Sequence, residues 1–331
     1  MTQPTLDVVA IGNAIVDVIA QSDDAFLAQH ALSKGGMQLI DAETADLLYS
    51  QMGGAMQISG GSAANTLAGL AALGKSCGFI GQVADDQLGQ IFTHDIKALG
   101  VDYRTAPVVG GTPTARCLVL VTPDAQRTMN TFLGASQDLP AAAIDNDLIA
   151  SASILYLEGY LWDPEEPRKA MRSAIEAARN AGRKVAFTLS DGFVIARHGG
   201  DFMELIDNGL IDILFSNEAE IQALAGVEGF EKAVAAIAPK VPLLISTRSE
   251  NGAVAIHKGT RYECTAAPVT KVVDTTGAGD LFAAGFLAAY VEGKDVTACL
   301  QLGSVAAAEV ISHFGARPET DLQALRREAG L

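Results

Sequence analysis

A short glycine-rich segment near the C-terminus carries the residues best suited to catalysis. It runs from Asp274 through Gly277, Ala278 and Gly279 to Asp280, and an apolar stretch of helical character follows it. Glycines let the backbone approach a ligand closely, and the free amides of a helix's first turn attract anions. A carboxylate beside such an anion site can take the proton of an attacking hydroxyl while the amides stabilise charge on a transferred group. The pattern therefore favours phosphoryl transfer, with Asp280 as the general base.

A simpler interpretation of the same segment stays open on these residues alone. Aspartate is favoured at the start of a helix, so Asp280 could do no more than cap the helix expected over Leu281–Val291. Gly277 and Gly279 would then serve only a tight turn. Residues 271–274 are expected to form the end of a strand, which would place the turn between a strand and a helix.

Two common nucleotide-binding patterns are rejected. Residues 69–76, Gly-Leu-Ala-Ala-Leu-Gly-Lys-Ser, have the spacing of a P-loop. That motif needs a strand before the glycine-rich loop and a helix after the lysine, whereas residues 63–73 have a helical pattern. Gly74 is therefore expected to end a helix, and Lys75 to be a surface charge. No dinucleotide fingerprint follows the first expected strand, so an NAD-dependent oxidoreductase is the least favoured enzyme class.

The composition narrows the class of protein. The chain has 331 residues, of which 49% are hydrophobic, and a formal net charge of −16 without a cluster of lysine or arginine. Nucleic acid is therefore not expected as a partner. The four scattered cysteines suit a reducing compartment, and neither a signal peptide nor an apolar run long enough for a bilayer is visible. We expect a cytoplasmic protein without a membrane partner.

Short apolar runs and helical patterns alternate along most of the chain, which predicts a layered α/β fold with a mainly parallel sheet in a single domain, 1–331. The expected strands are Leu6–Gly12, Gly78–Val83, Ile154–Leu157, Val185–Leu189, Ile211–Phe215, Leu243–Ser246 and Ala253–His257. The expected helices are Ala63–Leu73, Leu88–Leu99, Glu166–Ala181, Glu218–Ala225, Glu231–Ala238, Leu281–Val291 and Thr297–His313.

Two stretches break this alternation. Residues 16–41 and 103–132 have the pattern of short strands separated by Gly, Pro and Thr, without a strong helix between them. We predict that they form one small β-sheet. Since both stretches leave and rejoin the main pattern, this sheet is expected to be a lid over the carboxyl edge of the large sheet, where open α/β folds bind ligands.

Two motifs give the chain a resemblance to a known family. Residues 274–280, Asp-Thr-Thr-Gly-Ala-Gly-Asp, resemble the C-terminal signature of the ribokinase family of carbohydrate and nucleoside kinases, also called the phosphofructokinase B family. Residues 60–65, Gly-Gly-Ser-Ala-Ala-Asn, resemble its N-terminal glycine motif. The resemblance covers nearly the whole length. It implies a ribokinase-like three-layer sandwich with a β-sheet lid, ATP and Mg²⁺ as cofactors, and Asp280 as the base beside an anion hole.

The same resemblance implies roles for residues elsewhere in the chain. Asp17 resembles a carboxylate that holds two acceptor hydroxyls, with Gly61 and Asn65 completing the grip, although Asp17 could also be a turn residue. Asn217 and Glu220 resemble a motif that places Mg²⁺ and phosphates, largely through water. A capping arrangement at a helix start is the alternative for this pair, and both roles can hold together.

Other implied roles concern the nucleotide and a possible second ion. Thr247 and Ser304 resemble positions that line the nucleotide, and Asp274 and Thr276 resemble positions that bind a monovalent cation, K⁺, in some members. The anion hole itself would be formed by the backbone of residues 277–279.

The lid departs from the family pattern at one point. Residues 113–115 are Pro-Thr-Ala where relatives often have Pro-Thr-Gly, and Arg116 follows. Either Arg116 or the later Arg127 could contact phosphates when the lid closes. For each of them the alternative is a surface arginine in a salt bridge.

The acceptor is the least determined part of the prediction. Residues 36–43, 155–160 and 188–193 resemble the adenosine kinase branch more than ribokinase or fructokinase. A purine needs apolar faces and an amide, which Tyr160, Phe193 and Gln38 could supply, although such aromatic residues are more often part of a core.

The sequence thus favours transfer of the γ-phosphoryl group of ATP to the 5′-hydroxyl of adenosine or a related purine nucleoside. The alternatives are a sugar kinase of the ribokinase, fructokinase or ketodeoxygluconate type and a catalytically idle binding protein. A monomer or a homodimer fits the sequence equally well.

Overall fold

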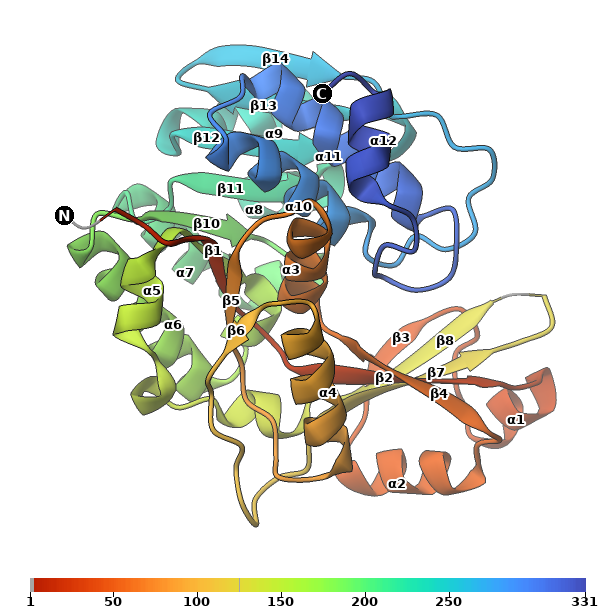
Figure 1. Ribbon diagram of the computed structural model, residues 1–331. Helices are drawn as coiled ribbons and strands as arrows, with labels where there is room; N and C mark the ends of the chain where they lie inside the picture. Colours follow the sequence, from red (N-terminus) through yellow and green to blue (C-terminus); the bar gives the residue numbers. More distant parts are fainter. Residues whose placement is uncertain (1–2, 125) are drawn as a thin grey trace.

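A computed structural model describes residues 3–124 and 126–331, so Ala125 of the predicted lid lies outside the described residues (Figure 1). The strands of the large sheet are β1 (Leu6–Ile11), β5 (Cys77–Ile80), β6 (Asp102–Tyr103), β9 (Ala152–Glu158), β10 (Lys184–Thr188), β11 (Ile213–Asn217), β12 (Leu243–Thr247), β13 (Ala253–His257) and β14 (Thr260–Cys264). Their order is β14-β13-β12-β11-β10-β9-β1-β5-β6. Neighbours from β12 to β6 pair in parallel, whereas β13 and β14 are antiparallel additions. The predicted α/β fold with a mainly parallel sheet is confirmed.

Helices cover both faces of this sheet. One face carries α3 (Ser62–Ala72), α4 (Gln87–Ala98), α10 (Ala278–Val291), α11 (Val296–Val310) and α12 (Leu322–Glu328). The other carries α5 (Asn146–Ser151), α6 (Glu165–Asn180), α7 (Gly192–Asp207), α8 (Glu218–Ala225) and α9 (Phe230–Ile237). Successive residues of β1 point into opposite cores, Val8 into one and Val9 into the other, because side chains alternate along a strand. Burial on both faces explains the continuous apolar runs of the sequence.

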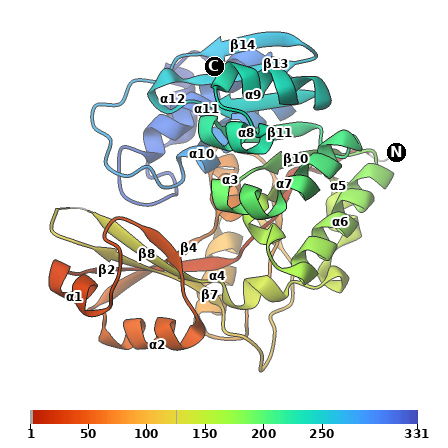
Figure 2. The ribbon, with the colours of Figure 1, turned by 180° about the vertical axis from the view of Figure 1, so that it is seen from behind.

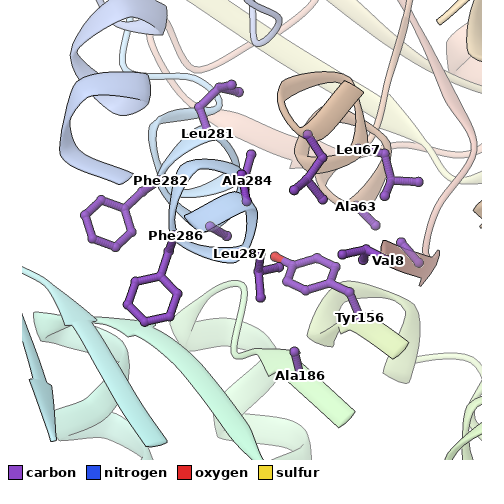
Figure 3. Close-up of a cluster of buried hydrophobic side chains, with 14 of the residues drawn as sticks. Val8, Ala63, Leu67, Tyr156, Ala186, Leu281, Phe282, Ala284, Phe286 and Leu287 are labelled. Atoms are coloured by element: carbon purple, nitrogen blue, oxygen red, sulfur yellow. The ribbon is translucent and has the colours of Figure 1, made fainter. Parts of the chain in front are cut away.

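Figure 3 shows the core under the site. Val8, Tyr156 and Ala186 of the sheet lie on the side of α10 that carries Phe286 and Leu287. Helices α3 and α10 also pack against each other, and a Cβ on Gly69 of α3 would lie 2.6 Å from Leu281 Cδ1. Gly69 therefore permits the close approach of the two helices. Both helices begin at the carboxyl edge of the sheet, where their first turns lie side by side.

A second, five-stranded sheet forms the lid (Figure 2). It consists of β2 (Ile15–Gln21), β3 (Met37–Leu39), β4 (Ala55–Gly60), β7 (Ala115–Val121) and β8 (Arg127–Phe132), in the order β3-β8-β7-β2-β4. Helices α1 (Asp24–Gln29) and α2 (Ala42–Gln51) cover the face that is turned away from α10. On that face Val18 and Leu118 of the sheet pack against Leu27 of α1 and Leu48 of α2.

The lid differs from the prediction in three respects. Strand β4 lies outside both predicted stretches, because its mixed polar and apolar residues give no clear strand pattern. Helix α1 lies inside the first stretch; it has only six residues, too few for a visible helical period, and Asp23 caps it by accepting from Phe26 N at 2.8 Å. The second stretch begins with β6, which pairs with β5 in the large sheet.

Two further expectations about elements were wrong. No strand is present at residues 271–274; the preceding strand is β14, and residues 265–277 are irregular in the described structure. Helix α10 begins at Ala278, so Asp280 lies inside its first turn. Helix α7 was not predicted, because Gly199 and Gly200 lower the helical propensity in its middle.

The P-loop spacing at residues 69–76 is not a phosphate site in this fold. Helix α3 ends before Gly74, which has a φ of 77° that glycine adopts readily, and the chain then enters β5. Lys75 Nζ lies 2.5 Å from Glu292 Oε1. The order is helix, turn and strand, the reverse of the P-loop order, as the sequence predicted.

In the described part of the chain, no helix has both the length and the apolar character to cross a bilayer.

Replacing Lys75 by alanine should therefore leave the affinity for ATP, the cofactor expected from the sequence, within about twofold of wild type, since the lysine serves only a salt bridge. Such a bridge contributes about 1 kcal/mol or less to the free energy of unfolding. Calorimetric titration with ATP and urea denaturation would measure the two effects. Arg326→Ala is the matched control, because Arg326 also pairs with Glu292. A tenfold loss of ATP affinity in folded Lys75→Ala would contradict the assignment.

Candidate active site

Asp280 is held between two helices at the carboxyl edge of the large sheet. Ser62 Oγ donates to Asp280 Oδ1 at 2.6 Å, and Asn65 Nδ2 donates to Oδ2 at 3.2 Å. Both donors lie in the first turn of α3. The side-chain oxygen of Asn65 is buried and has no partner among the described residues. The Asp280 carboxylate is thus oriented, and an acceptor oxygen stays free beside it.

The capping interpretation of Asp280 does not fit this geometry. Gly277 is the N-cap of α10, with a φ of 78°, and no side chain caps the helix. Asp280 is bonded to α3 instead. Burial raises the pKa of Asp280 to about 6, while the hydrogen bonds from Ser62 and Asn65 act in the opposite direction. The group is still largely ionised at neutral pH and near the range of an effective general base.

The turn before Asp280 presents free amides. A Cβ on Gly277 would lie 2.7 Å from Ala316 Cβ, whereas a Cβ on Gly279 would meet nothing within 4 Å. Ala278 N already donates to Thr275 O at 3.2 Å, but the amides of Gly279 and Asp280 have no acceptor in the described residues. An anion could therefore reach two adjacent amides of this turn, in the field of the helix N-terminus.

Asp17 lies on the face of the lid that α1 and α2 leave uncovered. It lies on β2 opposite Ile58 and Cys117, one residue out of phase with the helix-covered Val18. A Cβ on Gly60 would lie 2.7 Å from Asp17 Oδ2, so the neighbouring position has room only for glycine. Among the described residues, none donates a hydrogen bond to the Asp17 carboxylate.

The charges around Asp17 act in both directions on its pKa. Burial raises the pKa of Asp17 to about 6, the positive charges of Arg127 and Arg317 lower it, and Asp274 raises it.

Gly61, which caps α3, has a φ of 96°, and a Cβ there would lie 2.2 Å from Asn13 O. Gly61 thus lets the chain turn tightly from the lid into α3 beside Asp17.

Of the two lid arginines, Arg127 reaches the glycine-rich turn. It forms a buried ion pair with Asp274, and its guanidinium lies 5.5 Å from the centroid of the Phe314 ring. Arg116 pairs instead with Asp46 of α2, on the helix-covered face of the lid. The salt-bridge alternative therefore describes Arg116, whereas Arg127 connects the lid to the anion site.

The oxygens of Asp274 are fully engaged. Oδ1 accepts from Thr276 N at 3.1 Å and from Thr276 Oγ1 at 2.7 Å, while Oδ2 accepts from Gly315 N at 3.0 Å and from Arg127. A carboxylate has about four lone-pair positions. The side chains of Asp274 and Thr276 do not fit as ligands of a monovalent cation. The Asp274 oxygens already accept four hydrogen bonds, and Arg127 already supplies a positive charge there.

Asn217 and Glu220 form a capping box at the start of α8. Asn217 Oδ1 accepts from Glu220 N at 2.8 Å, and Glu220 accepts in return from Asn217 N at 2.9 Å and from Asn217 Nδ2 at 2.6 Å. Glu220 is 7% exposed, and burial raises its pKa to about 7. The capping alternative thus holds, and any contact of Glu220 with a metal would have to pass through water.

The other two nucleotide positions differ in their freedom to bind. Thr247 ends β12 and has only a long contact of 3.5 Å from its hydroxyl to Ser216 O. Ser304 is buried on α11, where its Oγ accepts from Ala267 N at 2.7 Å and donates to Thr265 O at 3.3 Å. Ser304 therefore holds the loop before the glycine-rich turn.

The three residues expected to contact a purine lie in different places. Tyr160 follows β9, and its hydroxyl donates to Ser190 O at 3.1 Å; burial raises its pKa, as do the charges of Asp191 and Asp280. Phe193 is 74% exposed in the first turn of α7. Gln38 pairs with Asn130, to which its Nε2 donates at 2.9 Å. This register places Gln38 on the helix-covered face of the lid, so the structure does not bring it together with Asp17.

Sequence reasoning missed four residues at this site. Ser62 and Glu158 lie inside segments that carried a resemblance, residues 60–65 and 155–160, whereas Asn13 follows the first expected strand. Arg317 follows α11 without any motif, and its Nε and Nη2 are buried without a partner in the described residues. Only the first two could have been found from the motifs.

Comparisons with known proteins agree with this geometry. Residues 6–322 match the model of a family described as pfkB family carbohydrate kinase. The structure of adenosine kinase from Sinorhizobium meliloti is 47% identical, with a TM-score of 0.91 over 98% of this chain and 99% of that chain. A "probable sugar kinase protein" from Rhizobium etli CFN 42 is 46% identical, with a TM-score of 0.92 over 100% of this chain and 99% of that chain. Fructokinase from Klebsiella pneumoniae is 29% identical over 77% of this chain and 84% of that protein.

The raised pKa of Glu220 gives a testable effect of pH on stability. Its pKa is about 7 in the folded protein, above the 4.5 of an unperturbed glutamate, so between these values the folded state binds more protons than the unfolded state. The free energy of unfolding should therefore fall as pH rises through this window. Glu220→Gln cannot ionise and should reduce this slope in urea denaturation between pH 4.5 and 7.5.

The control for this experiment is Glu228→Gln, which removes a negative charge from an exposed position of the following loop. It should keep the wild-type slope. An unchanged slope in Glu220→Gln would show that the buried carboxyl does not titrate in this range.

Proposed function

The chain belongs to the pfkB family of carbohydrate kinases, and we propose that it transfers the γ-phosphoryl group of ATP to the 5′-hydroxyl of adenosine or a related purine nucleoside. Membership of the family makes the protein a phosphotransferase. The observation that supports phosphoryl transfer at Asp280 is its orientation by Ser62 and Asn65 beside two free amides. The similarity to the adenosine kinase of Sinorhizobium meliloti supports a nucleoside as the acceptor.

In this proposal, the acceptor is held from the lid and from α3. Asp17 accepts hydrogen bonds from two ribose hydroxyls, since its carboxylate is free and a carboxylate can accept from both at once. The unpaired side-chain oxygen of Asn65 accepts from a further donor, with the backbone of Gly61 alongside. The 5′-hydroxyl then reaches Asp280, which takes its proton as the oxygen attacks.

The phosphate side of the site uses the glycine-rich turn. The amides of Gly279 and Asp280 stabilise negative charge on the transferred group, and the space beside Gly279 lets a phosphate approach. Mg²⁺, which is typical of kinases, would neutralise charge on the phosphates of ATP. Glu220 is proposed to act on it through water.

The remaining nucleotide contacts are divided between direct and supporting roles. Thr247 lines the nucleotide directly, Asn217 fixes Glu220, and Ser304 shapes the loop over it. We assign no step to K⁺, because Arg127 occupies the charge position at Asp274.

A sugar kinase is the second candidate, supported by the similarity to fructokinase. Two structural observations favour it. Gln38 lies on the face of the lid that α1 and α2 cover, and Phe193 is exposed, so neither of these two expected base contacts is placed beside Asp17. Either enzyme would act on a small molecule as a monomer or homodimer, and an adenosine kinase in the cytoplasm would serve purine salvage.

An assay of ADP release with a panel of acceptors would separate the two candidates. We expect kcat/KM for adenosine to exceed that for ribose, fructose and ketodeoxygluconate by about 10²-fold or more, because binding of the base adds several contacts that a free sugar lacks. 5′-Deoxyadenosine is the matched control, since it keeps the base and lacks the accepting hydroxyl. Turnover with a free sugar alone would make the nucleoside proposal wrong while leaving the phosphotransferase class intact.

A further inference from the structure

A buried carboxylate lies directly below the residues that hold Asp280. Glu158 ends β9 and is 0% exposed. Its Oε1 accepts from Asn13 N at 2.7 Å and from Asn13 Nδ2 at 2.6 Å, and its Oε2 accepts from Ala63 N at 2.7 Å. Ser136 Oγ in turn donates to Asn13 Oδ1 at 2.8 Å. One side chain therefore joins the ends of two central strands to the first turn of α3.

The contact with Ala63 replaces a missing helix cap. The N-cap of α3 is Gly61, which has no side chain to accept from the first-turn amides. Glu158 supplies that acceptor from another element, and its negative charge is favourable at a helix N-terminus. Ala63 lies between Ser62 and Asn65 in the same turn, so the position of this amide sets the positions of both donors to Asp280.

The surroundings allow little movement of Glu158. A Cβ on Gly12 would lie 2.5 Å from Glu158 Oε2 and 2.6 Å from Ala63 Cβ, so the backbone of β1 packs directly against the contact. The carboxylate is therefore enclosed by backbone on one side and by the helix on the other.

The buried carboxylate of Glu158 carries a cost as well as a benefit. Burying a charge without an opposite charge is unfavourable, and no ion pair of Glu158 occurs in the described residues. Burial raises the pKa of Glu158 to about 7, the hydrogen bonds from Asn13 and Ala63 lower it, and the charge of Asp280 raises it further. An apolar residue would avoid the cost of the buried charge, but it would leave the Asn13 and Ala63 donors without an acceptor.

We propose that Glu158 is a positioning residue for phosphoryl transfer, which holds the first turn of α3 so that Ser62 and Asn65 orient Asp280. The proposal rests on the role of Asp280 as the base, and it holds for a nucleoside or a sugar acceptor alike.

Glu158→Gln is the direct test. The amide fills the same volume and can still accept from Asn13, but its NH₂ group then meets the Ala63 N–H, donor against donor. A displacement of about 1 Å in a catalytic arrangement can lower turnover about 10²-fold. We expect kcat with the best acceptor of the panel to fall about 10- to 100-fold, and KM for ATP to change by less than about threefold.

Two further variants separate positioning from stability. Glu158→Asp keeps the negative charge on a side chain that is one methylene shorter, and its kcat should lie between those of Glu158→Gln and the wild type. If Glu158→Gln does not fold, Glu158→Asp is the variant that tests the proposal. Asp212→Asn is the matched control, because Asp212 Oδ2 accepts from Val185 N at 2.8 Å at the amino ends of the strands, away from the site. It should lower the free energy of unfolding without lowering kcat.

A double-mutant cycle shows whether Glu158 acts through α3. In the Ser62→Ala/Asn65→Ala background, Glu158→Gln should lower kcat by less than about threefold more, since the donors it positions are gone. An undiminished further loss would overturn the proposal, as would Glu158→Gln with wild-type kcat. The turnover of the wild-type protein with the acceptor panel tests the proposed function separately. Neither of the two contradicting results for Glu158 therefore bears on the kinase assignment.

Discussion

The hydrogen bonds that join Asp280 to the first turn of α3 are the contact on which the site depends. Ser62 and Asn65 lie 218 and 215 residues away from Asp280 in the chain, and they meet it because α3 and α10 pack together on one face of the sheet. The close helix approach at Gly69 makes this possible. The large sheet and its two cores thus bring two helix N-termini together, one with free amides and one with hydrogen-bond donors to Asp280.

A second constraint is the balance between the carboxylates and the arginines around Asp17 and Asp274. The charge of Asp274 raises the pKa of Asp17, and burial raises the pKa of both Asp17 and Asp280. Arg127 crosses from the lid to Asp274, and with Arg317 it lowers the pKa of Asp17. Through Arg127 the lid therefore places a positive charge beside Asp274, next to the glycine-rich turn.

The sequence carried enough information for the layers and for the glycine-rich turn, because both are written in local patterns: apolar runs, helical periods and adjacent glycines. The sequence could not show which face of the lid sheet is covered by α1 and α2 and which face carries Asp17. Gln38 and Asp17 both lie on strands with alternating residues, and only the packing of α1 and α2 decides that Gln38 turns away. Glu158 lies in residues 155–160, which carried a resemblance, but its contacts were hidden because its partners Asn13 and Ala63 come from distant segments.

The central claim, that Asp280 is the base of phosphoryl transfer, is tested most directly by the turnover of Asp280→Asn with ATP and the preferred acceptor. Asparagine has the same shape and can still accept from α3, but it cannot take a proton. Turnover should fall by about 10²- to 10⁴-fold, while calorimetric affinities for ATP and acceptor stay within a few-fold of wild type. Near-normal turnover of the folded variant would contradict the account.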